Sequence, residues 1–214
     1  MNEISSRLST CYSGIVNDVL QAMGERNFVL PHDLTALEPG QRLCGPAFTL
    51  SGRVVETDAH TTLLAWTKLL SASKRDHVWV CQPNTQAIAL MGELSAETLK
   101  LRGCRGCIID GGTRDAAFIL KIGLPIWRRF NTPADIVGHW LPDIIDGPIQ
   151  IGGVTIEPGD LMLADLDGVI RVPRRLAREV ADRAIEAMGT ENRVRTAILA
   201  GTDPVEAYLK HGKF

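Results

Sequence analysis

Residues 106–115 hold the side chains of this sequence that are best suited to chemistry. A short apolar run typical of a buried strand leads into Gly111 and Gly112, and we expect a turn there because glycine adopts backbone angles closed to other residues. Arg114 follows with a planar guanidinium that suits a carboxylate or an enolate. Asp115 comes next, and its oxygens suit Mg²⁺ or Mn²⁺. The segment therefore predicts an anion-binding and metal-binding turn after a strand.

A second strand and turn of the same kind lie upstream. An apolar strand at 87–91 is followed by Glu93 and by an amphipathic helix at about 94–102. A strand–helix–strand crossover makes the two strands parallel, so their carboxyl ends reach the same edge of the sheet. We therefore expect Glu93, Arg114 and Asp115 to face one pocket beside a helix N-terminus, where a metal and a small anion could bind.

The local sequence also allows a plainer interpretation of Arg114 and Asp115. The two could form an ordinary structural ion pair, with Asp115 as a negative charge at the start of a helix at about 114–122. The matching turn at Glu93 favours the pocket, because a structural pair needs no second carboxylate at the same edge.

These residues carry a resemblance to a known family. The segments 92–94 and 109–115 look like the corresponding motifs of the class II 4-hydroxy-4-methyl-2-oxoglutarate aldolases, a family that also includes the protein called regulator of ribonuclease activity A. A block at 157–173 and two segments at 16–20 and 39–47 follow the same family order. The resemblance therefore covers most of the chain.

The resemblance implies a fold and an assembly. It implies one α/β domain over 1–214, a compact three-layer α/β/β fold of the swivelling type with a partly parallel central sheet and short antiparallel strands. It also implies a homotrimer or a hexamer, with active sites between subunits. The C-terminal helices, from about 174 to 214, carry alternating charge and a thin apolar stripe, so we expect them at a subunit interface.

The activity that the resemblance implies is that of a divalent-metal lyase acting on short 2-oxo acids. Such an enzyme cleaves a 4-hydroxy-2-oxo acid to pyruvate or decarboxylates oxaloacetate, and both reactions pass through a pyruvate enolate. Mg²⁺ or Mn²⁺ on Asp115 would chelate the substrate, and Arg114 would stabilise the enolate oxygen. The turn at Gly92 would bind substrate, with the N–H groups of Leu94 and Ser95 holding its carboxylate.

Two glutamates complete the expected catalytic set. Glu93 would hold a metal-bound water or act as the base that takes the hydroxyl proton. Glu191 matches the family's C-terminal glutamate and would come from the neighbouring subunit; its other interpretation is an exposed helix glutamate. The chain departs from the characterised aldolases in three places, and these leave the substrate open. They are Ser95, where an aliphatic residue is usual, residues 127–130 after a strand, and the C-terminal residues 205–212.

The competing function is that of a non-catalytic regulator that binds a ribonuclease, as one branch of the family does. The presence of Glu93, Arg114 and Asp115 argues against a purely binding role, although it does not exclude a second one. The sequence does not choose between Mg²⁺ and Mn²⁺, and it does not name a pathway.

Composition excludes several other classes. The chain has 214 residues, a net charge of −2 and mixed charges, so no basic stripe indicates a nucleic-acid partner. No segment has the length of a membrane span, and residues 1–7 lack a leader-like apolar run, so we expect a cytoplasmic protein without a membrane partner. The five histidines are scattered, which disfavours zinc.

Three further motifs invite interpretations that we set aside. The five cysteines predict free thiols, and the pair Cys104 and Cys107 is expected to be buried rather than redox-active because Cys107 falls within a strand. Residues 165–168 predict a hairpin turn, since the twelve-residue calcium pattern is missing. No lysine stands at the carboxyl end of a strand facing the pocket, which disfavours a Schiff base.

The remaining elements follow from periodicity and capping signals. In the helix at about 94–102 we place Leu94, Thr98 and Leu101 on one face, with Gly103 just past its end. The other expected elements are a helix at 13–23, a strand at 47–50, a helix at 59–71 capped by Asp58, strands at 78–81 and 125–128, short strands at 149–151, 154–156, 161–163 and 169–172, and a helix at about 174–188.

Overall fold

A computed structural model describes residues 3–212 of the chain. Its helices and strands alternate through the centre of the chain, and helices lie at both ends. Their bounds are α1 (Glu3–Leu8), α2 (Ser13–Ala22), β1 (Thr35–Ala36), β2 (Leu43–Val54), α3 (Ala59–Ser71), β3 (Val78–Gln82), β4 (Ala89–Met91), α4 (Glu93–Leu101), β5 (Gly106–Thr113), α5 (Ala116–Ile122), β6 (Ile126–Asn131), β7 (Trp140–Ile145), β8 (Ile149–Ile151), β9 (Val154–Ile156), β10 (Leu161–Asp165), β11 (Gly168–Val172), α6 (Ala177–Leu199) and α7 (Pro204–His211).

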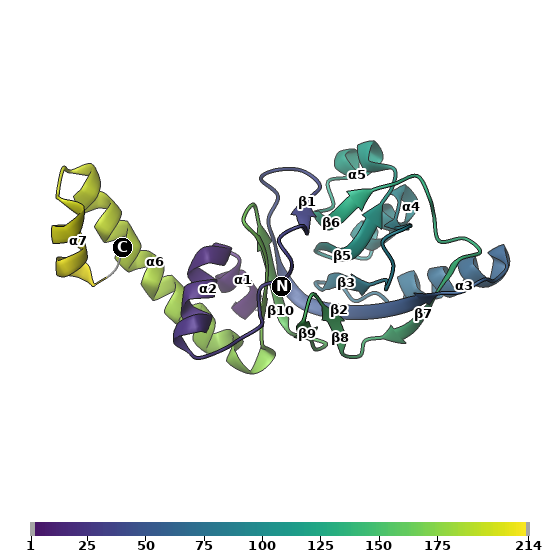
Figure 1. Cartoon of the computed structure of the whole chain (residues 1–214), viewed down its shortest axis with the longest axis horizontal. Coiled ribbons are helices and arrows are strands. Elements are labelled where there is room, and N and C mark those ends of the chain that lie inside the picture. Colours follow the sequence, from purple (N-terminus) through teal and green to yellow (C-terminus); the bar gives the residue numbers. More distant parts are fainter. Residues whose placement is uncertain (1–2, 213–214) are drawn as a thin grey trace.

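The main sheet is parallel at its centre and antiparallel at its edges (Figure 1). Its order is β1-β6-β5-β3-β2-β10-β11, with β4 paired to the end of β5 and β7 paired to β2. The pairs β2–β3, β3–β5, β4–β5 and β5–β6 are parallel. The predicted partly parallel sheet is therefore confirmed, and so is the parallel strand–helix–strand unit β4–α4–β5.

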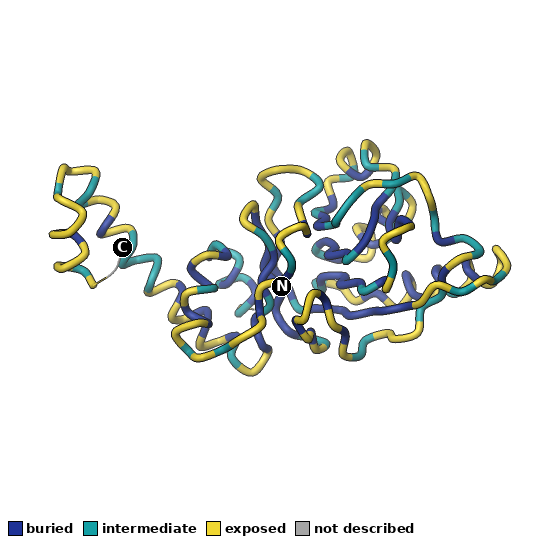
Figure 2. The backbone as a smooth tube through the Cα atoms, in the orientation of Figure 1, coloured by how far each residue is buried: buried dark blue, intermediate teal, exposed yellow. Residues whose placement is uncertain are grey.

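Side chains of the central strands alternate between two cores. Trp79 and Cys81 of β3 pack under the helices α3, α4 and α5, whereas Val78 and Val80 pack on the opposite face with the β8–β9 hairpin. Figure 2 draws most of these central strands in dark blue, the colour of buried residues. This arrangement of helices, sheet and hairpin is the three-layer α/β/β fold that we expected.

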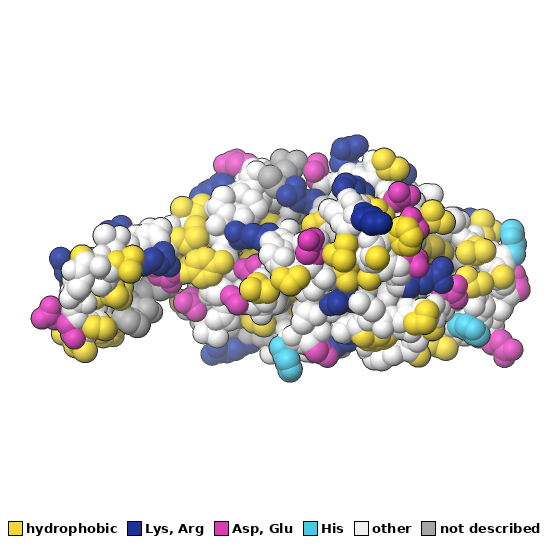
Figure 3. Space-filling view, turned by 90° about the horizontal axis from the view of Figure 1, so that it is seen from above, with side chains coloured by type: hydrophobic (Ala, Val, Ile, Leu, Met, Phe, Trp, Pro, Cys, Tyr) yellow, Lys and Arg dark blue, Asp and Glu magenta, His cyan; other side chains and the backbone are white. Residues whose placement is uncertain are grey.

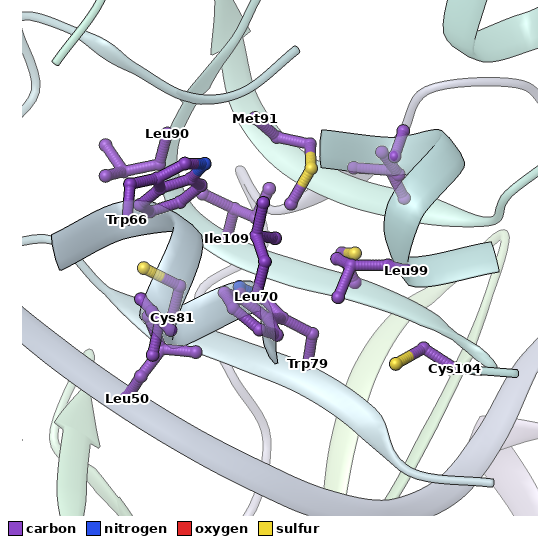
Figure 4. Close-up of a cluster of buried hydrophobic side chains, with 14 of the residues drawn as sticks. Leu50, Trp66, Leu70, Trp79, Cys81, Leu90, Met91, Leu99, Cys104 and Ile109 are labelled. Carbon is purple, nitrogen blue, oxygen red and sulfur yellow. The ribbon is translucent and has the colours of Figure 1, made fainter. Parts of the chain in front are cut away.

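The cysteines belong to these cores. All five are free and buried, and Figure 4 shows Cys81 and Cys104 among the apolar side chains of the helix-side cluster. Burial raises the pKa of the Cys104 thiol, and it raises the pKa of Cys107 well above its ordinary value. The prediction of buried structural thiols is confirmed.

The predicted turn at Gly111 and Gly112 was wrong. Strand β5 continues through both glycines to Thr113, and neither has a positive φ. They are close-approach positions instead: a Cβ on Gly112 would lie 2.7 Å from the Phe130 ring and 2.9 Å from the carbonyl oxygen of Ile88. The two glycines are thus required because neighbouring atoms lie close to the strand, and not because the chain reverses its direction there.

Gly112→Ala should destabilise the protein by about 1–3 kcal/mol, because the added methyl group forces neighbouring atoms apart in a packed interior. Urea unfolding followed by circular dichroism measures the change. Gly189→Ala is the matched control, since nothing lies within 4 Å of its Cβ position in α6. An equal or larger loss in the control would contradict the packing explanation.

Helix α4 buries a different face from the one we expected. Leu94 and Leu101 are 76% and 83% exposed, while Ala96 and Leu99 are fully buried. Both stripes have helical spacing, and the one with the small alanine lets the helix approach the sheet closely. The expected end is confirmed, because Gly103 follows the helix with a φ of 82°.

Other boundaries moved where a tertiary partner extended an element. Strand β2 has 12 residues because its first part pairs with β10, its middle with β3 and its last part with β7. Strand β7 was not predicted. The Asp58 cap is confirmed, since its carboxylate accepts the backbone N–H of Thr61 at 2.9 Å.

The C-terminal helices form an arm that projects from the body (Figure 1). The expected helix at 174–188 is α6, which starts at Ala177 after a 3₁₀ turn and has 23 residues. Its first half packs on α1 and α2, whereas the arm beyond carries charged side chains mixed with exposed hydrophobic ones (Figure 3). None of the helices between residues 3 and 212 is long and apolar enough to cross a membrane.

Candidate active site

The carboxyl ends of three parallel strands meet at one cavity of about 470 Å³. Strand β4 leads into the N-terminus of α4, β5 leads into the turn before α5, and β6 leads into the loop at 132–139. The polar side of the cavity is lined by Gly92, Glu93, Ser95, Arg114, Asp115 and Asp135. The parallel-strand argument thus placed Glu93, Arg114 and Asp115 correctly around a single hollow.

Arg114 is held at the centre of this polar side. Its Nη1 donates to Asp135 Oδ2 at 2.8 Å, and its Nε lies 3.5 Å from Asp115 Oδ2. Its backbone N–H donates to the carbonyl oxygen of Met91 at 2.8 Å, which joins the end of β5 to the end of β4. The Arg114 side chain is 40% exposed. The carboxylates of Asp115 and Asp135 orient its guanidinium, and the side chain is still accessible to a ligand.

Asp115 has a left-handed backbone, with φ 56° and ψ 33°. Its side chain makes no capping hydrogen bond to α5; instead Oδ2 accepts the backbone N–H of Glu93 at 3.2 Å. The plainer interpretation is therefore met in part, since Asp115 stands at the N-cap of α5 and pairs with Arg114, but its carboxylate also reaches the start of α4. Aspartate and asparagine adopt this region more readily than other non-glycine residues, and Asn27, Asp76, Asn84 and Asp146 do so elsewhere in the chain.

Gly92 is needed for space rather than for its backbone angles. Its φ of −133° is open to any residue, but a Cβ there would lie 2.7 Å from Asp115 Oδ2 and 3.3 Å from Arg114 Nε. The absent side chain lets the Asp115 carboxylate reach the first N–H of α4. Sequence inspection had placed Gly92 in the binding turn without this reason.

Asp135 is a site residue that the sequence analysis missed. It lies beyond the end of β6, and its Oδ1 accepts the backbone N–H of Val137 at 3.1 Å while Oδ2 accepts Arg114. The sequence did contain a signal for it. The carboxyl ends of parallel strands meet at one edge of a sheet, and the same argument could have been applied to the expected strand at 125–128. The expected strand at 125–128 in fact runs to Asn131, so Asp135 stands close behind its end.

Helix α3 supplies another part of the cavity lining, including Trp66. Trp66 donates its indole N–H to Ser95 Oγ at 2.9 Å, which ties α3 to the first turn of α4. Ser95 is one of the positions at which we expected a departure from the aldolase pattern. An aliphatic residue could not accept this hydrogen bond. The serine hydroxyl therefore satisfies the indole N–H of the buried Trp66.

Glu191 lies outside the cavity of its own chain. It is on α6, which belongs to the opposite end of the molecule from α4 and α5 (Figure 1). The Tyr12 hydroxyl donates a hydrogen bond to its carboxylate. Burial and this carboxylate raise the pKa of Tyr12 to about 12. A contribution of Glu191 to a neighbouring subunit's site stays a prediction.

The donor set suits a hard divalent cation. Between residues 3 and 212, no three histidine, cysteine, aspartate or glutamate side chains stand close enough to hold a metal by themselves. Mg²⁺ usually needs only one or two carboxylates and keeps several waters. Around the cavity, the three carboxylates of Glu93, Asp115 and Asp135 and the one guanidinium of Arg114 give a formal charge of −2. A divalent cation would neutralise this charge.

Comparison with known proteins places this geometry in a family. A family model described as "RraA-like: Aldolase/RraA" matches residues 14–171. The chain is 26% identical over 181 residues to a protein of Halalkalibacterium halodurans named "Putative 4-hydroxy-4-methyl-2-oxoglutarate aldolase", covering 85% of this chain and 83% of that one. It is 27% identical over 203 residues to protein DlpA of Legionella pneumophila, covering 94% of this chain and 32% of DlpA. The chain therefore spans about a third of the length of DlpA.

A solved structure supports the same assignment. RraAS2 of Streptomyces coelicolor, described as an unusual member of the RNase ES inhibitor RraA protein family, superposes with a TM-score of 0.81 at 30% identity, covering 91% of this chain and 96% of that one. The family model and the superposition therefore agree with each other, and both fit the mixed α/β architecture with its mostly parallel sheet. This chain belongs to the RraA-like family.

Proposed function

We propose that this protein is a divalent-metal-dependent lyase that forms a pyruvate enolate from a short 2-oxo acid. The substrates in view are a 4-hydroxy-2-oxo acid, cleaved by a retro-aldol reaction, and oxaloacetate, which loses carbon dioxide. The observation that carries the proposal is the convergence of Arg114, Asp115 and the N-terminus of α4 on one cavity. In this cavity the N-terminus of α4 would bind the substrate carboxylate, Asp115 would bind the metal, and Arg114 would stabilise the developing charge of the enolate.

In this proposal Arg114 stabilises the oxygen on which negative charge develops. Its 2.8 Å hydrogen bond to Asp135 fixes the guanidinium plane before substrate arrives, so little reorganisation is needed in the transition state. Asp135 therefore acts as a positioning residue.

The first turn of α4 would hold the substrate carboxylate. The N–H groups of Leu94 and Ser95 belong to this turn, where backbone donors have no partner within the helix and the helix dipole favours an anion. Glu93 stands beside them and is half-buried. It would take the proton of the C4 hydroxyl group, so that the C3–C4 bond breaks and its electrons pass into the enolate.

Asp115, with Glu93 near it, would hold Mg²⁺ or Mn²⁺. When bound there, the cation supplies Lewis acidity that draws electron density onto the keto oxygen. The described residues that line the cavity offer carboxylates and include no histidine or cysteine, which supports a hard cation rather than zinc.

Pyruvate release from oxaloacetate and from 4-hydroxy-4-methyl-2-oxoglutarate tests the proposal. We expect turnover with Mg²⁺ or Mn²⁺ above a protein-free blank containing the same metal, loss of turnover in excess EDTA, and recovery when metal is restored. The blank is needed because metal ions alone promote oxaloacetate decarboxylation. Full turnover in EDTA by protein without bound metal would contradict a metal-dependent reaction.

Binding of a ribonuclease is the second candidate function. The description of the Streptomyces relative as a member of an RNase inhibitor family supports it. The two functions separate in one comparison: Arg114 and Asp115 variants should lose lyase activity, whereas a docking function would persist in them. A protein without turnover that inhibits a ribonuclease would favour the regulator.

We propose a homotrimer or hexamer in which the arm of α6 and α7 meets a neighbouring subunit. Support comes from the arm's exposed apolar side chains, which include Leu199 and Leu209 at 81% and 75% exposed. Such an interface would also be the route by which Glu191 reaches another subunit's cavity. The small 2-oxo acid is the other partner that this function requires.

A further inference from the structure

We infer that Asn131 binds the carboxylate on C4 of a substrate such as 4-hydroxy-4-methyl-2-oxoglutarate. This inference rests on the proposed lyase function and adds a specificity residue to the same site. It starts from a second hollow, of about 340 Å³, whose lining residues are Arg114, Asp115, Ala116, Asn131, Thr132 and Pro133. Arg114 and Asp115 also line the cavity described above, so the two spaces meet at this pair.

Asn131 stands at the carboxyl end of a parallel strand, as Arg114 does. It is the last residue of β6 and pairs in register with Thr113, the last residue of β5. The two strands lie side by side in Figure 1. Since Arg114 follows Thr113 directly, Asn131 and Arg114 share one edge of the sheet.

The side-chain amide of Asn131 has a fixed orientation. Its Oδ1 accepts the hydroxyl group of Thr113 at 2.9 Å and the Nε–H of Arg128 at 3.1 Å. The guanidinium of Arg128 can only donate, so the amide atom that faces it must be the oxygen. Within residues 3–212 the amide nitrogen, Nδ2, has no hydrogen-bond partner. Its two N–H donors therefore remain for a ligand in the second hollow.

The residues that hold this amide are themselves held in place. Thr113 is fully buried. Arg128 Nη1 donates to Thr35 Oγ1 at 2.8 Å and to the carbonyl oxygen of Thr35 at 3.1 Å, which ties the amide to β1. A donor that is already ordered loses little conformational entropy when a ligand binds. Asn131 is thus preorganised for recognition.

The groups in the first cavity already have other roles in the proposed reaction. The start of α4 takes the carboxylate on C1 of the substrate, and Asp115 takes the cation. Among the described residues that line this cavity, Arg114 is the one cationic side chain, and it is assigned to the enolate oxygen. The carboxylate on C4 therefore needs donors elsewhere, and the second hollow begins at the same Arg114 and Asp115.

The charges of the site permit a second substrate carboxylate once the metal is bound. The divalent cation offsets the formal charge of −2 around the first cavity. Apart from Arg114 and Asp115, the second hollow is lined by uncharged residues. Asn131 is also exposed, so a carboxylate beside it keeps part of its hydration and avoids the cost of full burial. Neutral N–H donors are sufficient for such a group.

Asn131→Asp tests the inference with a nearly isosteric change. Aspartate keeps an oxygen for Thr113 and Arg128, but it replaces the free donors with a charged oxygen that repels a carboxylate. The two substrates are 4-hydroxy-4-methyl-2-oxoglutarate and 4-hydroxy-4-methyl-2-oxopentanoate, which has a methyl group in place of the C4 carboxylate. At saturating Mg²⁺ we expect kcat/KM for the first to fall about 10- to 100-fold, mainly through KM, the usual effect of losing a hydrogen bond to a charged group. The second should be nearly unchanged.

Asn131→Ala separates the lost donor from the added charge. It removes both N–H groups and adds no charge, so it should shift the ratio of the two kcat/KM values in the same direction by about 10-fold. A wild-type ratio in either Asn131 variant, or equal losses for both substrates, would overturn the inference.

Asn27→Asp is the matched control for charge. It adds the same charge at an exposed asparagine that lines neither space, and aspartate tolerates the φ of 52° found there. This variant should keep the wild-type ratio. A shift as large as that of Asn131→Asp would overturn the inference.

Failure of the proposed function itself gives a different signature. Metal-dependent exchange of the pyruvate methyl protons with D₂O, followed by NMR, reports enolate formation without any C4 group. Wild-type protein and both Asn131 variants should exchange at similar rates. No exchange by the wild type would refute the lyase, whereas exchange that is lost only in the Asn131 variants would overturn the assignment of Asn131 to the C4 carboxylate.

Discussion

Arg114→Lys is expected to keep the fold and to lower kcat by about 10²–10³, the usual cost of removing one preorganised electrostatic donor. Lysine retains the positive charge and a contact to Asp135, but an ammonium cannot make the planar two-point contact of a guanidinium. The native side chain is 40% exposed, so little stability should be lost. Steady-state pyruvate release, with unfolding curves for both proteins, measures the two effects.

Asp115→Asn gives the contrast that identifies the metal residue. Asparagine tolerates the left-handed backbone at this position, so the turn should survive, while loss of the charged ligand should weaken metal binding. Raising Mg²⁺ should partly restore turnover in this variant and should not restore it in Arg114→Lys. Near-normal activity in both variants would mean that this cavity is not the active site, and it would favour the regulator function.

Gly92→Ala should abolish most of the activity while leaving stability almost unchanged. The new Cβ would lie 2.7 Å from Asp115 Oδ2, so the carboxylate must leave the N-terminus of α4 and Arg114 must follow. A misplacement of about 1 Å in such a group costs on the order of 10² in rate. The backbone itself accepts alanine, because φ is −133°. Turnover should therefore fall strongly, while the thermal unfolding temperature should hardly change.

The control for this substitution is another glycine-to-alanine change far from the cavity. Gly189→Ala lies in the open middle of α6, with nothing within 4 Å of the new atom. It should leave turnover unchanged and stabilise the helix by up to about 1 kcal/mol. If Gly92→Ala also kept full turnover, the close contact between Gly92 and Asp115 would have no catalytic meaning.

The sequence by itself determined the strand–helix–strand unit and the edge at which its charged residues meet. Apolar runs and helix periodicity are local signals, and the parallel pairing of β4 with β5 then follows from the length of the connection between them. Glu93, Arg114 and Asp115 could thus be brought to one cavity without any coordinates. The cap at Asp58 and the glycine end at Gly103 were equally local.

Only the tertiary structure decided what depended on partners distant in the chain. Asp135 joined the site because β6 runs beside β5, and β2 grew to 12 residues because three strands pair along it. Periodicity could not choose which face of α4 is buried, since both candidate stripes have a helical spacing and the packing surface selects between them. Gly111 and Gly112 were misread for the same reason: a glycine required by a close neighbour has the same sequence signal as a glycine required by its own backbone angles.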